Sequence, residues 1–220
     1  MTRRSNRAIT YCVAGLIACL AADLGSKQWA LDSLSTERPG ERPAVCEVDA
    51  QGYPRWQRIR QEPVVLIEGY LELDYAENCG AAFGLLRDSP SWIRHTIFGL
   101  AASAAAIALM VMFVQGRGGP LFAWSVPFVV SGALGNLVDR LRLGYVVDFI
   151  RFHVHDSFEY PTFNVADIVI VIGVALLVLD GSKKPKEAKT AEAPAPEPKA
   201  EGGRKRRRKK RDDDAEAERA

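Results

Sequence analysis

The stretch GALGNLVDRLRLGYVVDFI, residues 132–150, places Asp139, Arg140 and Asp148 at the end of a long apolar segment. An ionisable side chain at membrane depth costs at least about 2.5–3.5 kcal/mol, so such residues are rarely kept there without a use. Another aspartate, Asp167, lies at the start of the next apolar segment. Two carboxyls that share one site have divergent pKa values, so one can act as an acid while the other acts as a base on water. Asp148 and Asp167 are therefore candidates for a water-activating pair, which requires neither a metal nor a nucleophilic side chain.

Four apolar runs would have to position these carboxyls. The chain has 220 residues and a mean hydropathy of −0.06, values that also suit a soluble domain, but its apolar residues are concentrated in blocks. These blocks cover residues 8–22, 92–113, 121–137 and 165–179. About 20 apolar residues in a helix cross the ~30 Å hydrocarbon core of a bilayer. The sequence therefore predicts an all-α membrane protein, with four transmembrane helices inside a domain of residues 1–181.

The basic residues next to the apolar runs predict the orientation of the chain, because Lys and Arg are enriched in short cytoplasmic segments. They lie before the first run, between the second and third runs, and after the fourth run, and they are Arg3, Arg4, Arg7, Arg117, Lys183, Lys184 and Lys186. Both termini are therefore expected in the cytoplasm, with the segments 32–91 and 143–163 outside. This topology brings Asp148 and Asp167 to the same outer level of the membrane.

The first outer segment, residues 32–91, divides into two parts. Residues 35–63 are polar and punctuated by Pro and Gly, so this insertion is expected to be irregular. Residues 64–76 alternate apolar and polar side chains, a pattern that predicts a β-strand. The C-terminal residues 182–220 contain 14 Lys or Arg and 9 Asp or Glu and are rich in Ala and Pro. They are expected to form a disordered basic tail in the cytoplasm.

The four cysteines divide into two pairs. Cys12 and Cys19 lie in the first apolar run, where they are expected to be small apolar residues. Cys46 and Cys79 both fall on the outer side, where disulfides persist, and a bond between them would stabilise the fold by roughly 3–4 kcal/mol in the chain-entropy model. The alternative is a small loop residue at Cys79 and an exposed thiol at Cys46. The spacing of these cysteines does not suggest a metal site.

Several candidate residues also have a purely structural interpretation. An aspartate at a helix start, such as Asp167, is typical of an N-terminal cap, and Asp139 is expected to form a buried ion pair with Arg140. Asp23 and Lys27 are four residues apart in the acid-first order that stabilises a helix. Lys27 is expected to extend outward to the membrane surface. The first 22 residues also have features of a cleavable secretory signal, but the helical pattern continues beyond them.

Four stretches resemble, in order and spacing, the sequence boxes of a known family. They are DLGSK (23–27), ENCGAAFG (77–84), GALGNLVDRLRLGYVVDFI (132–150) and FNVADIVIVIG (163–173). The resemblance covers about residues 8–180 and is to the bacterial lipoprotein signal peptidases, also called signal peptidase II. It implies an aspartic endopeptidase of the cytoplasmic (inner) membrane. Such an enzyme cuts the signal peptide from prolipoproteins just before a diacylglyceryl-modified cysteine.

The resemblance also implies roles for individual residues. Asp148 and Asp167 correspond to the catalytic pair of the family. The positions expected to support the site or bind substrate are Asn78, Gly80, Phe83, Asn136, Asp139, Arg140 and Asn164. Asp23 and Lys27 match the first box and are expected to be structural. No metal or cofactor is expected.

The strand at 64–76 and the loop that contains Phe83 are expected to form a small extracytoplasmic β-cradle over the site. The expected partners are lipidated prolipoproteins and membrane lipid, and the chain is expected to act as a monomer. No specific nucleic acid partner is expected, although the basic tail could contact anionic lipid or RNA. The rival interpretation is a transporter with intramembrane carboxyls, which predicts ionisable residues spread over the membrane depth. Here they gather at one membrane face.

Overall fold

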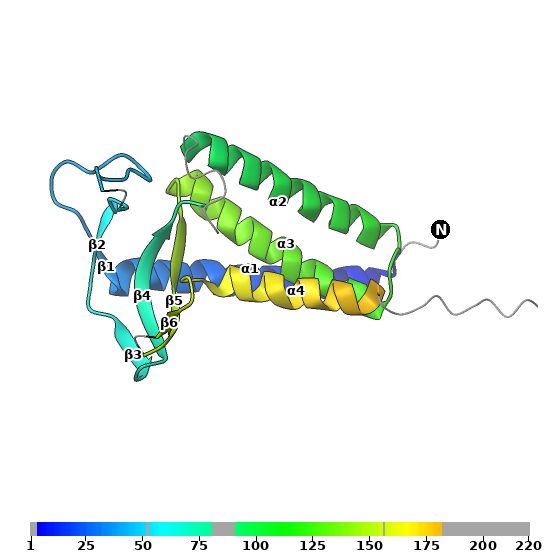
Figure 1. Cartoon of the computed structure of the whole chain (residues 1–220). Helices are drawn as coiled ribbons and strands as arrows, with labels where there is room; N and C mark the ends of the chain where they lie inside the picture. The colour runs from blue at the N-terminus through cyan, green and yellow to red at the C-terminus, as the bar shows by residue number, and fades with distance from the viewer. Residues whose placement is uncertain (1–3, 52, 81–90, 156, 182–220) are drawn as a thin grey trace, which may run out of the picture. The chain divides into compact units, whose positions relative to one another are not determined.

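The computed structural model describes residues 4–51, 53–80, 91–155 and 157–181 of the chain. In this part of the chain four helices form, each over one of the predicted apolar runs: α1 (Asn6–Ser33), α2 (Ser91–Val114), α3 (Pro120–Arg142) and α4 (Val165–Gly181) (Figure 1). Among the described residues, α1 and α3 are long and apolar enough to cross a membrane, and Gly99–Val114 within α2 is a shorter apolar helix. Each of the four predicted helices is therefore present, and α1 and α3 have the length and composition of a membrane span. The tail from residue 182 and the loop with Phe83 lie outside the described residues.

Helix α1 is continuous through the polar residues that follow its apolar run. Ser5 caps its N-terminus by accepting a hydrogen bond from the backbone N–H of Ala8, and the helix continues to Ser33. Asp23 and Lys27 lie within it and form the predicted ion pair, with 2.9 Å between Nζ and Oδ2. The predicted extension of the first helix beyond residue 22 is therefore confirmed.

Helix α3 packs against each of the other three helices. Two of its glycines allow neighbouring elements to approach closely. A Cβ atom at Gly132 would lie 2.5 Å from the carbonyl oxygen of Ala166 in α4, and a Cβ atom at Gly135 would overlap the carboxylate of Asp23 in α1. The small residues of the GALGN stretch are therefore required because α1 and α4 both contact this side of α3.

Strands from both outer segments form a four-stranded antiparallel sheet in the order β3-β4-β5-β6. Its strands are β3 (Val64–Ile67), β4 (Leu71–Asn78), β5 (Val146–Val154) and β6 (Phe158–Glu159), and β1 (Ser35–Glu37) and β2 (Arg58–Arg60) form a separate pair. The single strand predicted over 64–76 is wrong in detail, because the chain turns at Gly69, whose φ is 75°, and makes a hairpin. The segment 143–163, for which no strand was predicted, contains β5 and β6.

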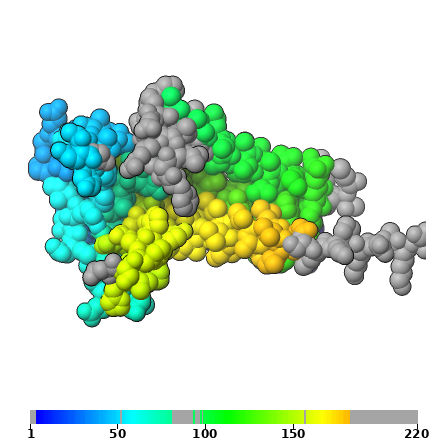
Figure 2. Space-filling model, in the orientation of Figure 1, coloured from blue at the N-terminus to red at the C-terminus, as the bar shows by residue number. Residues whose placement is uncertain are grey.

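A hydrophobic core joins the C-terminal end of α1 to the sheet. Its buried side chains come from four places: the end of α1 with its C-cap residue, strand β4, the turn before β5, and strand β5. They are Ala30, Leu31, Leu34, Tyr75, Tyr145, Val147 and Phe149. The hydroxyls of Tyr75 and Tyr145 are 3.0 Å apart and hydrogen-bonded, so these buried polar groups are satisfied. The insertion 35–63 (blue to cyan in Figure 2) gathers at the end of the helices where the sheet lies. It is largely irregular, as predicted, apart from β1, β2 and one isolated bridge.

The close approach of α3 and α4 can be tested with Gly132→Ala. The added methyl group would meet a backbone oxygen at 2.5 Å, which cannot rotate away, so we expect the helices to separate slightly. Overpacking of this kind lowers the free energy of unfolding by typically about 1–3 kcal/mol. Thermal or denaturant unfolding in detergent measures the change.

The matched control is Gly25→Ala in α1, where a Cβ atom meets nothing within 4 Å. There the substitution should stabilise the helix by roughly 0.5–1 kcal/mol, because Ala has less backbone freedom to lose than Gly. Equal effects of the two substitutions would contradict the close contact at Gly132.

Candidate active site

The carboxyls of Asp148 and Asp167 come together because the chain before α4 runs back along β5. The N–H groups of Phe149 and Ile150 donate to the carbonyl oxygen of Phe163 at 3.1 and 2.9 Å, and the N–H of Phe163 donates to Ile150 at 3.1 Å. These bonds place Asn164, and with it the first turn of α4, beside Asp148 in β5.

Asp148 is buried, with 1 % of its surface exposed. Its Oδ1 accepts a hydrogen bond of 2.6 Å from the side-chain amide of Asn164, and its Oδ2 accepts one of 2.8 Å from that of Asn78. Burial raises the pKa of Asp148 to about 7, and the charge of Asp167 contributes to this rise, while the two amide hydrogen bonds oppose it. Asp148 is thus a carboxyl that can carry a proton near neutral pH.

Asp167 lies in the first turn of α4 and has two roles. Its Oδ2 accepts the backbone N–H of Asn164 at 3.2 Å, and the Oδ1 of Asn164 accepts the N–H of Asp167 at 3.1 Å, so the two residues cap the helix reciprocally. Its Oδ1 accepts a hydrogen bond of 2.9 Å from the side-chain amide of Asn136 in α3. The capping interpretation is therefore correct, and it leaves the other oxygen directed at the cluster around Asp148.

Behind the two carboxyls lies a buried lysine. The Nζ of Lys27 is 2.9 Å from Asp23 and 3.2 Å from Asp139, and it donates a hydrogen bond of 2.8 Å to the Oδ1 of Asn136. Lys27 is 1 % exposed, so the prediction that it extends outward to the surface is wrong. The reason is that two carboxylates from different helices stabilise its charge inside the protein.

The same carboxylates also hold the backbone next to the candidate pair. The Oδ2 of Asp139 accepts the N–H of Val147 at 3.1 Å, and the Oδ1 of Asp23 accepts the N–H of Ala166 at 2.8 Å. Val147 directly precedes Asp148, and Ala166 directly precedes Asp167. Each buried aspartate therefore fixes the position of one candidate catalytic aspartate through the backbone.

The predicted ion pair between Asp139 and Arg140 is replaced by the pair of Asp139 with Lys27. Neighbouring residues on a helix point in different directions, so they do not face each other. Arg140 is half-buried, and its Nη1 donates to the backbone carbonyl of Asn136 at 3.1 Å. Its charge interacts with those of Asp148 and Asp167. Arg140 thus lies near both candidate carboxyls.

The turn after β4 completes the cluster. The N–H of Gly80 donates to the Oδ1 of Asn78 at 2.8 Å, and Gly80 has a φ of 80°, which favours glycine. The described residues thus bring together the predicted positions Asn78, Gly80, Asn136, Asp139, Arg140, Asn164 and both candidate carboxyls. Phe83 is not among the described residues.

The sequence did not predict that Phe163 pairs with Ile150, because no strand was expected in residues 143–163. The run YVVDFI at residues 145–150 is rich in β-branched and aromatic residues, and this composition is the signal that could have predicted a strand. The backbone contacts of Asp23 and Asp139 have no comparable signal, since they depend on tertiary packing.

Comparison with known proteins identifies the family. The family model described as signal peptidase (SPase) II matches residues 15–182, more than half of the chain. This chain belongs to the signal peptidase II family. Signal peptidase II is an aspartic protease family, so the protein is a protease, and the predicted resemblance to this family is confirmed.

Relatives and solved structures agree with this membership of the signal peptidase II family. The lipoprotein signal peptidase of Serratia proteamaculans is 37 % identical over 177 residues, which cover 80 % of this chain and 89 % of the relative. That of Chromobacterium violaceum is 34 % identical over 156 residues, covering 62 % and 96 %. A bacterial membrane enzyme solved by the in meso method at 2.3 Å resolution has the same fold, with a TM-score of 0.59, 23 % identity and coverage of 85 % and 98 %. The protein therefore shares the fold of that membrane enzyme.

Asp139→Asn tests the buried charge cluster of this signal peptidase II. The change keeps the side-chain shape but removes a negative charge that faces Lys27. Losing one partner of a buried ion pair costs about 3–5 kcal/mol, and we expect the lower end because Asp23 still faces Lys27. The unfolding midpoint in detergent reports the change.

Asp32→Asn, in the exposed last turn of α1, is the control for this change. Among the contacts that the structure describes, the carboxylate of Asp32 accepts exposed hydrogen bonds of 3.0 and 3.2 Å from the side-chain amide of Gln28 alone, so the midpoint should stay close to that of the wild type. A comparable shift in both variants would mean that the cluster is open to water.

Proposed function

We propose that this protein removes signal peptides from prolipoproteins whose cysteine carries a diacylglyceryl group, cutting just before that cysteine. Asp148 and Asp167 form the catalytic pair. The observation that carries the proposal is the burial of Asp148 between the amides of Asn78 and Asn164, beside a second carboxyl held by Asn136. Such a pair shares one proton and can activate water.

The reaction requires each carboxyl to move one proton in each step. Asp148 donates its proton to the oxygen of the scissile carbonyl, while the Asp167 carboxylate takes a proton from water and the water oxygen bonds to the carbonyl carbon. In the resulting diol, the carbon–nitrogen bond breaks when Asp167 returns its proton to the leaving nitrogen. Asp148 recovers a proton from one hydroxyl as the carboxyl product forms. The pair ends in its starting state, as a catalyst must.

All four helices are proposed to span the inner membrane, with both termini in the cytoplasm. Asn136 and Asp139 lie near the C-terminal end of α3, and Asp167 lies in the first turn of α4, so the pair is at one end of the helices. At about 1.5 Å per residue, the 23 residues of α3 are long enough to reach from one membrane face to the other. The pair then lies at the outer face, where water has access.

This position explains why a lipid on the substrate would matter. A signal peptide is an apolar segment, and the acyl chains on the cysteine that follows it remain in lipid while the scissile bond reaches the carboxyls. Each methylene group kept in an apolar environment contributes roughly 0.8 kcal/mol to anchoring the substrate in the membrane, where the enzyme meets it. The purified protein should therefore cleave a diacylglyceryl-modified prolipoprotein and leave its unmodified form uncut. Mass spectrometry of the products locates the cleaved bond, and cleavage of both forms at equal rates would contradict the lipid requirement.

Asp148→Asn and Asp167→Asn should each lower kcat/KM by roughly 10²–10⁴-fold, the range for loss of a general acid or base. Asparagine keeps the shape of the side chain but can neither store nor deliver the shared proton. The control is Glu68→Gln, in the exposed turn between β3 and β4, which should leave cleavage unchanged. Substantial activity in either Asp variant would remove that residue from the catalytic pair.

The pH dependence of kcat/KM should show a basic limb near pH 7. Asp148 has its pKa raised to about 7, so it is protonated below this pH and ionised above it. The active pair holds one proton, so cleavage should fall as pH rises through about 7 and Asp148 loses its proton. Initial rates from about pH 5 to about pH 9 measure this limb. A constant kcat/KM through about pH 9 would show that Asp148 does not supply the proton.

A further inference from the structure

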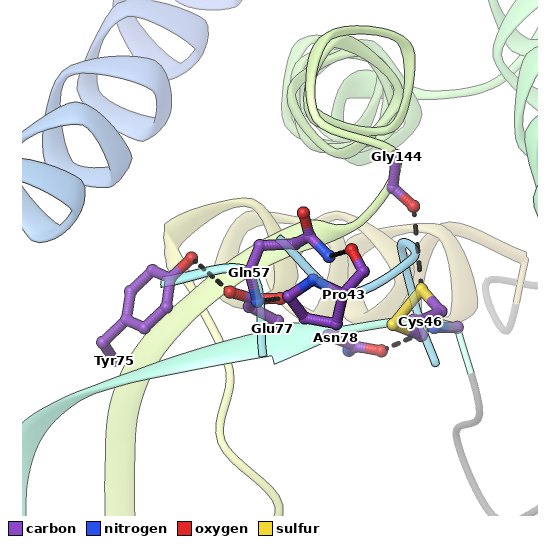
Figure 3. Close-up of a disulfide and its surroundings, with 9 residues drawn as sticks. Pro43, Cys46, Gln57, Tyr75, Glu77, Asn78 and Gly144 are labelled. Atoms are coloured by element: carbon purple, nitrogen blue, oxygen red, sulfur yellow. Dashed lines mark hydrogen bonds between the residues drawn. A yellow bond between two sulfur atoms is a disulfide. The ribbon is translucent and has the colours of Figure 1, made fainter. Parts of the chain in front are cut away.

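The insertion 35–63 is covalently attached next to the candidate active site. Cys46 forms a disulfide with Cys79, which directly follows Asn78 at the end of β4 (Figure 3). The sequence left the pairing of these cysteines open, and the structure shows the bond. Asn78 is the residue whose side-chain amide donates to the Oδ2 of Asp148 at 2.8 Å.

The same part of the insertion also contacts the chain that leads into β5. The Sγ of Cys46 lies 3.9 Å from the carbonyl oxygen of Gly144. Gly144 has a φ of 81°, and a Cβ atom there would come within 2.9 Å of the Cγ1 of Val45. Val45 and Cys46 therefore pack against the turn between α3 and β5. Asp148 follows this turn by four residues.

These two attachments hold the open end of a strand pair. Asn78 and Val146 are the last partners in the β4–β5 ladder, and Ala76 lies opposite Asp148. The end of a ladder has neighbours on one side only, so it separates more easily than the middle. The insertion contacts both strands at this end. It is bound to the segment after β4 through the disulfide, and it packs against the turn before β5 at Gly144.

The direction of the Asn78 amide depends on the turn that carries Cys79. The N–H of Gly80 donates to the Oδ1 of Asn78 at 2.8 Å, which leaves the amide nitrogen to face Asp148. On the other side of Asn78, the carboxylate of Glu77 accepts the N–H of Gln57 from the insertion at 2.9 Å (Figure 3). It also accepts the N–H of Arg58 at 3.0 Å. Both neighbours of Asn78 are thus fixed to the insertion.

We propose that the Cys46–Cys79 disulfide is a positioning element of the active site, which holds the Asn78 amide on Asp148 and makes cleavage depend on the oxidised state of this bond. The proposal rests on the catalytic roles given above to Asp148 and Asp167. A dithiol opens the bond by transferring two electrons and two protons: the Sγ–Sγ bond breaks, two thiols form, and the dithiol becomes a cyclic disulfide. The remaining contacts of Glu77 then hold the insertion on one side of Asn78 only.

The test compares cleavage by wild-type protein and by Cys46→Ser/Cys79→Ser, each with and without a dithiol. We expect the double variant to have a kcat/KM lower by roughly tenfold, the size of effect that the loss of one hydrogen bond can produce. The dithiol should lower the activity of the wild type toward the same level and leave the double variant unchanged. Cys12→Ser/Cys19→Ser, which removes the two free cysteines of α1, is the matched control and should respond to dithiol as the wild type does.

Asn78→Ala separates positioning from general stability. If the disulfide acts through the Asn78 amide, removing the bond from Asn78→Ala should cause little further loss. The basic limb of the pH profile should also move to higher pH in Cys46→Ser/Cys79→Ser, because the Asn78 hydrogen bond lowers the pKa of Asp148. A merely structural disulfide would give equal losses in both backgrounds and leave the limb in place.

The outcomes distinguish this proposal from the proposed function. If oxidised wild-type protein does not cleave the lipidated substrate, the proposed function fails. If it cleaves equally well with the bond intact and removed, the positioning role fails and the proposed function stands. A loss of activity that accompanies unfolding at the assay temperature, measured by circular dichroism, would also overturn the positioning role.

Discussion

Lys27 carries a positive charge at a place where 1 % of its surface reaches solvent, and a charge can be kept there only with partners close by. Its partners are Asp23 in α1 and Asp139 in α3, and each of these carboxylates also binds a backbone N–H, that of Ala166 or of Val147. The charge thus fixes the first residues of β5 and of α4 relative to α1 and α3. The arrangement of Asp148 and Asp167 is a consequence of this cluster, since each follows one of the two held residues.

The groups that touch the two carboxyls directly are mostly neutral. Asn78 and Asn164 bind Asp148, and Asn136 binds Asp167. An amide can orient a carboxyl in either protonation state, whereas a cation at the same distance would strongly favour the ionised form. The ammonium group of Lys27 does not touch Asp167 directly. The side-chain amide of Asn136 lies between them and hydrogen-bonds to both. This order of contacts combines a rigid site with a carboxyl, Asp148, whose pKa remains raised.

The apolar runs predicted the helices well because burial or lipid exposure of a long apolar segment depends on local composition. The Asp23–Lys27 pair was also predictable, since both residues lie on one turn of a helix. The partner of Asp139, the burial of Lys27 and the Phe163–Ile150 pairing depend on how distant segments pack, which spacing in one sequence does not specify. The hairpin within 64–76 was missed because alternation predicts a strand but not where it reverses. The sequence did not decide whether Cys46 and Cys79 form a disulfide, because two cysteines on one side of a membrane need not be neighbours.

The hydrogen bond from the N–H of Ala166 to Asp23 joins residues 143 positions apart, one in the first and one in the last of the described helices. A chain made from its N-terminus exposes Asp23 to its surroundings long before Ala166 exists, because domains emerge from the ribosome in sequence order. During this interval the carboxylate and its lysine can satisfy each other, as they lie on one helix. Contacts between remote segments form only after the loop between them has closed. With the catalytic role proposed for Asp167, the order of synthesis keeps the protein inactive until α4 has docked.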